Sequence, residues 1–265
     1  DGTPGSNDMP GRLTFFTTDD GSDSPTERMR ITKLGRVGIG TDSPSSELHV
    51  KDASAGSRII VEASASAQEA DIQIKTADDG QGWVLFNNGS ANKGVVKYNH
   101  ASDYMSFRTN GTDDQIKIDS AGHVTMPRQP AFQVRKSSSQ DSIPTSTTTI
   151  TFDSEIFDQN GDFASNTFTA PVTGKYQFNV HIRLETLDSA DASFYQMKVL
   201  TSNRTYIFTL DPNGFGVDLD YYSFAWSALA DMDANDTAYI TIIQSGGASQ
   251  TDIHTESYFS GYLVA

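Results

Sequence analysis

Large aromatic side chains are distributed very unevenly along this chain, and the distribution limits what each half can fold into. Of its 27 phenylalanine, tyrosine and tryptophan residues, seven lie in residues 1–129 and 20 in residues 130–265. Burial of such side chains is a main favourable contribution to folding, so only the second half holds the material for a conventional core. Pro127 and Pro130 would interrupt any strand between the halves, which predicts a domain boundary there.

The second half has the pattern of an all-β domain. Apolar residues occupy every second position from Tyr176 to Leu184, which is typical of a strand with one buried face. Other runs of strand length recur at regular spacing, and no stretch has helical periodicity. We expect them at Thr147–Phe152, Thr167–Thr169, Phe194–Leu200, Thr205–Leu210, Tyr221–Leu229, Ala238–Gln244 and Ser257–Val264. This series predicts two packed sheets.

The first half contains an internal repeat. Residues 29–37 match residues 116–124 at an offset of 87, and each copy predicts a short strand, a glycine turn and a second short strand. Between the copies lie further alternating pieces of strand length, at Arg58–Val61, Asp71–Lys75, Trp83–Phe86 and Val95–Tyr98. We therefore divide this half into two β-rich modules, residues 1–50 and 51–129.

Strands with so few bulky apolar residues bury too little surface to offset the cost of ordering the chain. Association offers a solution, because three copies wound about one axis share a core and leave no sheet edge free. The sequence therefore predicts an intertwined homotrimeric β shaft followed by a C-terminal all-β head. The alternative is an ordinary small monomeric β-domain.

Charge and composition exclude several classes of protein. The formal net charge of −15 opposes nucleic-acid binding, because a phosphate backbone would be repelled. The absence of cysteine excludes disulfides, cysteine-ligated zinc and thiol catalysis. No run of about 20 apolar residues is present, so no membrane insertion is expected. Because residue 1 is aspartate rather than methionine, we expect a missing N-terminal region.

A search for catalytic chemistry finds no motif, so no enzyme, no catalytic residue and no cofactor are predicted. The five histidines lack metal-binding spacing, and no Gly-x-Ser-x-Gly sequence occurs. Asp231–Asp236 begins like a calcium-binding loop, but Asp236 stands where glycine is needed and Ile242 where glutamate is needed. A solvated turn is the better interpretation of this segment.

Two stretches carry a family resemblance. Asn160–Phe163, followed by Phe168–Phe178 and the closing Ser257–Leu263, resembles the globular head of the complement C1q family. The resemblance covers about residues 130–265. It implies a ten-stranded jelly roll related to the tumour-necrosis-factor fold, a compact trimer, and binding without catalysis. Some members of this family hold calcium at the trimer apex, so Ca²⁺ remains an open ligand here. A collagen-like stalk is absent from this sequence.

The first half is similar to a different group of proteins. Glu27–Ile31, the Gly35–Pro44 run that begins GRVGIGT, and Leu48–Val50 resemble a sequence found in tail fibres and other virion proteins of tailed phages, and also in bacterial surface proteins. The resemblance implies an extracellular, virion-borne tail fibre. It further implies a bacterial surface receptor, either glycan or protein, and attachment to other tail or baseplate proteins through the missing N-terminal region.

Antiparallel strands alternate in direction, so loops of the head can be assigned to the end that faces away from the shaft. Those loops are Ser137–Ser146, Thr186–Ala192, Asp211–Asp220 and Ser245–Glu256. The candidate receptor-binding residues in them are Asp188, Asp191, Asn213, Phe215, Asp218, Asp220, Asp252, His254 and Glu256. Their acidity favours a cationic ligand or a bridging cation. The alternatives are a head that only registers the trimer, a bacterial surface adhesin, and a tailspike that degrades polysaccharide.

Overall fold

A computed structural model describes residues 6–7, 10–52, 56–64, 66–111 and 113–265. The chain divides into two compact units, one up to Gln73 and one from Ile74 onward. Within the described ranges every regular element is a strand apart from one short 3₁₀ helix, and none is a helix long and apolar enough to cross a membrane.

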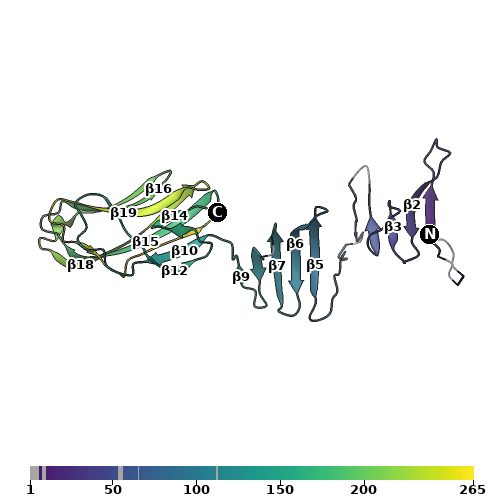
Figure 1. Ribbon diagram of the computed structural model, residues 1–265, viewed down its shortest axis with the longest axis horizontal. Coiled ribbons are helices and arrows are strands. Elements are labelled where there is room, and N and C mark those ends of the chain that lie inside the picture. The colour runs from purple at the N-terminus through teal and green to yellow at the C-terminus, as the bar shows by residue number, and fades with distance from the viewer. Residues whose placement is uncertain (1–5, 8–9, 53–55, 65, 112) are drawn as a thin grey trace. The chain divides into compact units, whose positions relative to one another are not determined.

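The first unit contains a four-stranded sheet in which the strands follow chain order (Figure 1). It is formed by β1 (Leu13–Thr17), β2 (Thr26–Ile31), β3 (Val37–Ile39) and β4 (Leu48–Val50). The first three strands are antiparallel neighbours, and β4 pairs with β3 in parallel.

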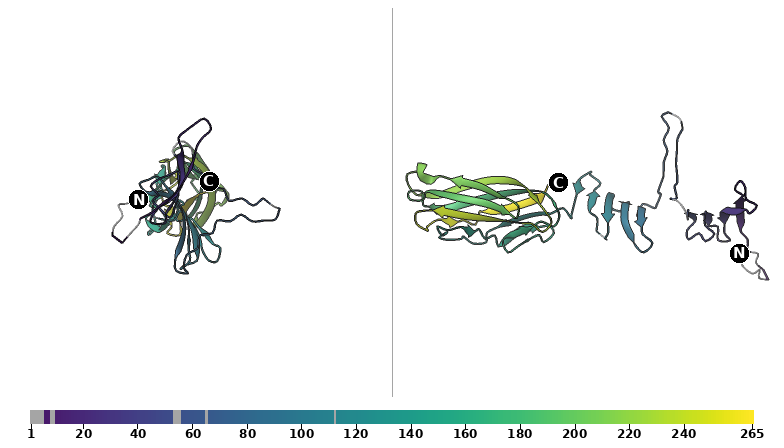
Figure 2. Two further views of the ribbon diagram at one scale, coloured as in Figure 1. Left: turned by 90° about the vertical axis from the view of Figure 1, so that its right-hand side faces the viewer. Right: turned by 90° about the horizontal axis from the view of Figure 1, so that it is seen from above.

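The second unit begins with an antiparallel five-stranded sheet, again in chain order. Its strands are β5 (Gln81–Asn87), β6 (Asn92–Asn99), β7 (Tyr104–Thr109), β8 (Ile116–Ile118) and β9 (Val124–Thr125). Figure 2 shows these strands as a single layer. The strands expected at Trp83–Phe86 and Val95–Tyr98 lie inside β5 and β6.

The predicted repeat is confirmed as a structural repeat. Gly35 and Gly122 both adopt positive φ, +78° and +85°, in the turns that follow β2 and β8. Gly35 N donates to Thr32 O at 2.9 Å, and Gly122 N donates to Asp119 O at 3.0 Å. Glycine suits both positions because a Cβ atom disfavours this conformation.

The strands expected at Arg58–Val61 and Asp71–Lys75 are not formed, so this prediction is wrong for the described chain. Their large apolar side chains are exposed, with Ile59 and Ile72 at 68 % and 78 %. Alternating apolar and polar residues give a strand one apolar face, but a strand forms only where a neighbouring strand supplies backbone hydrogen bonds. No strand pairing includes either segment.

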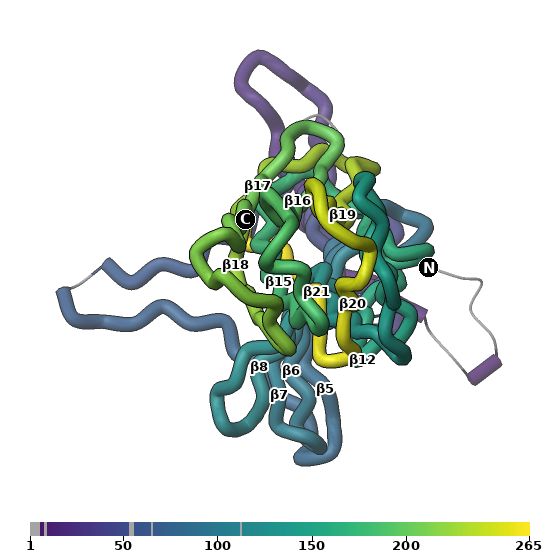
Figure 3. The backbone as a smooth tube through the Cα atoms, turned by 90° about the vertical axis from the view of Figure 1, so that its left-hand side faces the viewer, coloured from purple at the N-terminus to yellow at the C-terminus, as the bar shows by residue number. Residues whose placement is uncertain are grey.

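The head is a jelly roll of two packed sheets, as expected for residues 130–265. One sheet has the order β12-β10-β21-β15-β18, with β20 beside β15, and the other has the order β13-β14-β19-β16-β17, with β11 beside β19. Each sheet therefore has six strands, five along its path and one beside it, so the head has two strands more than the ten expected. Figure 3 looks at the head end-on and separates β17, β16 and β19 from β18, β15, β21 and β12.

The strand bounds of the head follow. The first sheet comprises β10 (Ala131–Arg135), β12 (Ser154–Asp158), β15 (Gly174–Leu187), β18 (Leu219–Met232), β20 (Asp252–Ile253) and β21 (Tyr258–Leu263). The second comprises β11 (Thr148–Thr149), β13 (Phe163–Ala164), β14 (Thr167–Thr169), β16 (Phe194–Thr201), β17 (Thr205–Leu210) and β19 (Thr237–Ser245). The 3₁₀ helix η1 (Pro212–Gly214) follows β17.

The core between these sheets uses the residues that the alternation predicted. Tyr176, Phe178, Val180, Ile182 and Leu184 on β15 are all buried, and the side chains between them face outward. Full burial of such a side chain contributes about 1.5–3 kcal/mol. A group of stacked and tilted rings forms the middle of the core, namely Phe132, Phe152, Phe163, Phe168, Phe178 and Phe259.

The start and the end of the head lie side by side. Leu263 N donates to Pro130 O at 3.0 Å, and Gln129 Nε2 donates to Leu263 O at 3.0 Å. In Figure 1 the C-terminus marks this end, and the loop that precedes β18 lies at the opposite end of the head. We call that opposite end the distal end.

Candidate functional site

Hydrogen bonds join four loops at the distal end. We call Ser137–Ser146, Thr186–Ala192, Asp211–Asp218 and Ser245–Thr251 the distal loops. Ser142 N donates to Asp252 Oδ1 at 2.7 Å, Ser189 N to Asp218 Oδ1 at 2.9 Å, and Ala248 N to Asp188 Oδ2 at 2.5 Å. Each bond crosses from one loop to another loop or to the strand that follows it. The loops therefore form one connected surface on a rigid scaffold, where binding residues are commonly carried.

Asp188 is the buried centre of this network, with 2 % of its surface exposed. Its Oδ1 accepts from Asp191 N at 3.0 Å while its Oδ2 accepts from Ala248 N. Gly247 has a positive φ of +71°, and a Cβ there would lie 2.2 Å from Asp188 Oδ2. Asp188 therefore fastens two loops together, and its carboxylate is committed to backbone donors.

Asp218 performs the same task for the loop before β18. Its Oδ1 accepts from Ser189 N and from Ala190 N at 2.9 and 3.1 Å, and its Oδ2 accepts from Gln250 Nε2 at 2.9 Å. These bonds lower the pKa of Asp218, because they stabilise the ionised carboxylate, and the bond from Gln250 has the largest effect. The carboxylate accordingly holds three loop segments in place.

Buried hydroxyl groups form hydrogen bonds directly beneath the distal loops. Tyr195 OH lies 2.7 Å from Thr251 Oγ1 and 3.2 Å from Asp188 O. Burial raises the pKa of Tyr195 to about 12, so its phenol stays protonated at physiological pH. Tyr195, Thr251 and Gly247 belong to no sequence motif that marks them for this role, and the glycine pair Gly246–Gly247 is the one signal of a tight loop contact.

The loop between β17 and β18 exposes apolar groups at the distal end. Phe215 is 39 % exposed and rests against the ring of Tyr222, with centroids 5.5 Å apart, while Val217 is 65 % exposed. The loop is shaped by Asp211, whose Oδ1 accepts from Asn213 N at 3.0 Å, and by Gly216 with φ +72°. This tip presents apolar surface on an ordered turn.

The remaining candidates separate into two groups. Asp191, Asn213 and Asp220 are exposed at the distal end, beside the apolar tip. The structure does not place His254 and Glu256 with them. Both lie along the outer face of β15, where Glu256 Oε2 accepts from Arg183 Nη1 at 2.5 Å and His254 Nε2 lies 3.7 Å from Glu185 Oε1. The Arg183 bond lowers the pKa of Glu256.

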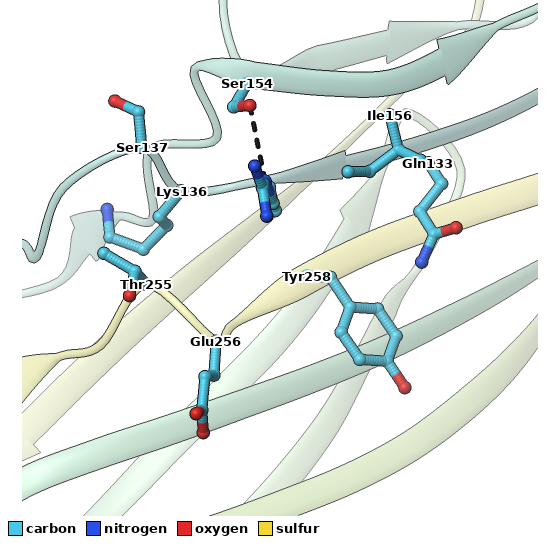
Figure 4. A pocket seen from close by; sticks show the side chains of 9 residues that line it. Gln133, Lys136, Ser137, Ser154, Ile156, Thr255, Glu256 and Tyr258 are labelled. Carbon is cyan, nitrogen blue, oxygen red and sulfur yellow. Dashed lines mark hydrogen bonds between the residues drawn. The ribbon is translucent and has the colours of Figure 1, made fainter.

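Glu256 also borders an open hollow of about 500 Å³ on the outer side of this sheet (Figure 4). Its lining comes from β10, β12 and the start of β21. Lys136 is buried, and its Nζ donates to Thr151 O and to Thr151 Oγ1, both at 2.9 Å, so the ammonium is already engaged. Burial lowers the pKa of Lys136. Arg135 Nε donates to Ser154 Oγ at 3.5 Å between the paired strands β10 and β12.

Two of the carboxylates considered for calcium, Asp231 and Asp236, are engaged with the protein itself. Asp231 pairs with Arg204 at 2.8 Å, and Asp236 Oδ2 accepts from Asn203 Nδ2 at 2.8 Å and from Asp233 N at 2.8 Å. The segment forms the turn between β18 and β19. Among the residues that the structure describes, no group of three or more histidine, aspartate or glutamate side chains is placed to hold a metal ion.

Comparison with known proteins finds a matching family model and several similar solved structures. The family model of the C1q domain matches residues 131–264. The globular domain of zebrafish complement 1qA is 20 % identical, with 51 % of this chain and 98 % of that chain covered and a TM-score of 0.38. A crystal structure of murine APRIL is 7 % identical, with 52 % and 100 % covered and a TM-score of 0.38. No curated protein matches the sequence. The family match spans just over half of the chain and coincides with the jelly roll, so this protein belongs to the C1q domain family.

Proposed function

We propose that this protein is the receptor-binding part of a homotrimeric tail fibre of a bacterial virus, and that the distal loops of its head bind a structure on the host surface. The observation that carries the proposal is the apolar tip formed by Phe215 and Val217 on loops held together by Asp188 and Asp218. The function requires no bond making or breaking by the protein.

An exposed aromatic side chain on an ordered loop has a physical cost that a ligand would remove. Phe215 and Val217 keep apolar surface in water although the loop that carries them is fastened at both ends. Apolar groups gathered at one place on a polar rim are typical of interaction sites. Asp191 and Asp220 lie in the surrounding rim, so a neutral or cationic receptor group would be favoured over an anionic one.

The outer face of the β15 sheet supports the trimer. Tyr221 and Leu229 on β18 are 62 % and 57 % exposed, and Tyr262 on β21 also faces outward. Large apolar groups on the outside of a sheet favour contact with a further protein surface. Three copies would present three identical tips, and avidity would then raise the overall affinity without a tight single site. The resemblance of the Gly35–Pro44 run supports a virion origin and an extracellular location.

The proposal is tested by cell binding. The fluorescently labelled full chain is mixed with a panel of bacteria, and bound fluorescence is measured by flow cytometry. On a strain that binds it, we expect the double variant Phe215→Ser, Val217→Ser to bind about tenfold more weakly, which corresponds to about 1.4 kcal/mol. The control is Ile207→Ser, which removes a 56 % exposed side chain from β17. Equal binding by both variants and the parent chain would refute the role of the tip.

A second candidate is a head that only registers the trimer, which the exposed apolar groups on the outer face of β18 favour. The two functions predict opposite results. If the head only clamps the trimer, the Phe215, Val217 variant retains full cell binding, whereas Leu229→Asp lowers the solution mass towards that of a single chain. If the distal loops bind the receptor, cell binding falls while the mass is unchanged.

A further inference from the structure

The two faces of the β5–β9 sheet differ sharply in chemistry. One face carries a row of paired apolar residues across four strands, in which Val84 is opposite Val96, Val96 opposite Phe107, and Phe107 opposite Ile116. Neighbouring rows add further apolar residues on the same side. We call this the apolar face, and its residues are Val84, Phe86, Val96, Tyr98, Met105, Phe107, Ile116, Ile118 and Val124. None of them is charged.

The opposite face carries the charges of these strands. Lys97 is buried, and its Nζ donates to Tyr104 OH at 2.9 Å and pairs with Asp114 Oδ2 at 3.3 Å. Lys117 Nζ lies 4.2 Å from the centre of the Tyr104 ring. The charged groups of this face have partners close by, although the face also carries the apolar residues Trp83, Leu85 and Val95.

The sheet of the first unit repeats the design. Its apolar face is formed by two rows, Leu13–Ile31–Val37–Leu48 and Phe15–Met29–Ile39–Val50. Arg30, Gly38 and His49 form a row on the other face. The repeat offset of 87 places Ile31 and Val37 at the positions of Ile118 and Val124, so equivalent hairpins contribute equivalent residues to both apolar faces. The same arrangement therefore occurs twice in one chain.

An apolar face on a single-layered sheet lacks the second layer that stable domains provide. Phe86 and Val84 are 59 % and 46 % exposed, and Leu13 in the first sheet is 55 % exposed. Several such side chains together make an apolar patch on the order of 500 Å² on the β5–β9 sheet, which is the size at which monomer patches are usually functional. The faces are therefore interaction surfaces.

The net charge of the chain indicates what covers the apolar faces. Two copies of a chain with a net charge of −15 repel each other over most of their surfaces, and the apolar faces are where identical surfaces can meet without opposing charges. An isologous or cyclic contact brings the same residues together, so an uncharged face is self-complementary. The β5–β9 face also has a hollow of about 260 Å³ beside Gly82, bordered by Ile74, Tyr98 and Met105, that can receive a side chain.

We propose that the apolar faces of the β1–β4 and β5–β9 sheets are each covered by the same face of further copies of this chain, and that the charged faces point outward. The inference rests on the trimer in the proposed function and goes further, because it names the face of each sheet that forms the interior of the shaft.

The absence of cysteine from the chain allows a direct test on the full protein. Val84 and Leu85 form a matched pair: they are adjacent on β5, 46 % and 48 % exposed, and on opposite faces. Single variants Val84→Cys, Phe107→Cys and Leu85→Cys are treated with a flexible bismaleimide and run on a denaturing gel. We expect the first two to shift from 28.8 kDa to 57.6 kDa, twice the chain mass, and Leu85→Cys to remain at 28.8 kDa.

Three other outcomes would overturn the inference. Equal cross-linking at Val84 and Leu85 would show that the faces are not distinguished. Cross-linking at Leu85 alone would place the charged face inside. A double variant Ile60→Cys, Phe107→Cys that forms a cross-link within one chain, with none between chains, would show that residues 56–64 of the same copy cover the face.

Light scattering on the same samples separates this inference from the proposed function. A mass near 86 kDa, three times 28.8 kDa, without cross-linking at Val84 or Phe107 would reject the assigned face and leave the trimer intact. A mass of 28.8 kDa would reject both. Loss of cell binding by the Phe215, Val217 variant is independent of either result.

Discussion

Asp188 and Gly247 are in such close contact that a methyl group on residue 247 would lie 2.2 Å from the Asp188 carboxylate. The contact allows Asp188 to accept the Ala248 amide and so to hold two distal loops together. Replacing Asp188 by asparagine puts an amide where one backbone donor now bonds. We expect a loss of about 1–3 kcal/mol in stability, because a buried donor is left without an acceptor.

Denaturant unfolding of Asp188→Asn measures this loss, and hydrogen exchange at Ala248 and Asp191 locates it. The control is Asp191→Asn, in the same loop but exposed. Unchanged exchange protection at Ala248 in the Asp188 variant would contradict the fastening role.

The ion pair between Asp231 and Arg204 makes part of the stability depend on pH. The hydrogen bond from Arg204 is the main cause that lowers the pKa of Asp231 from 3.8 to about 2. A carboxylate whose pKa is lower in the folded state stabilises the fold above its unfolded pKa, and the contribution disappears as the pH falls through the folded value. We therefore expect Asp231→Asn to lower Tm at pH 7, with the difference from the parent shrinking below pH 4 and vanishing near pH 2.

Thermal unfolding between pH 7 and pH 2 provides the measurement. Asp233→Asn, two residues away in the same turn, serves as the comparison. A Tm difference for Asp231→Asn that stays constant down to pH 2 would show that the ion pair is not its origin.

Close packing at the end of β21 makes Gly261 sensitive to substitution. A Cβ there would lie 2.6 Å from Phe178 and 2.8 Å from Phe132, two buried rings that have no room to move. Overpacking of this kind costs about 1–3 kcal/mol. We expect Gly261→Ala to lower the urea midpoint of the head, whereas Ser260→Ala, on the outward side of the same strand, changes it little. An unaltered midpoint for Gly261→Ala would show that the rings adjust.

The two equivalent turns allow a test of backbone strain without steric contact. A Cβ on Gly35 or Gly122 would meet no atom within 4 Å, so a substitution there is opposed by its positive φ alone. Alanine should cost about 1 kcal/mol at each site and asparagine less, because asparagine tolerates this conformation better. Unfolding of the four single variants, alanine or asparagine at Gly35 or Gly122, would measure this loss of stability. Equal effects of alanine and asparagine would argue against the left-handed turn.

The sequence alone predicts a strand correctly where a segment of alternating apolar residues lies beside another strand. Tyr176 to Leu184 formed the expected strand because each inward residue packs against the second sheet. Asp71–Lys75 has the same local alternation, yet this segment remains unpaired, because alternation does not specify a neighbouring strand. The fold class was therefore predictable, while pairing in the first half was not.

The candidate site shows a similar limit. The glycines on either side of Phe215 predict an exposed aromatic side chain, and the structure shows Phe215 partly exposed; its role in binding stays a prediction. The charge of Asp188 and Asp218 marks them as candidates, but in the structure both carboxylates already accept hydrogen bonds from neighbouring loops. Composition shows that a loop is acidic; only the three-dimensional arrangement shows which oxygen atoms are already occupied.

The separation between fastening carboxylates and an exposed tip has an evolutionary consequence. Substitutions at Phe215 and Val217 leave untouched the bonds through which Asp188 and Asp218 shape the distal end. Under the proposed function, a lineage carrying this head would change its receptor by substitutions at the tip while the bonds that hold the loops stay the same.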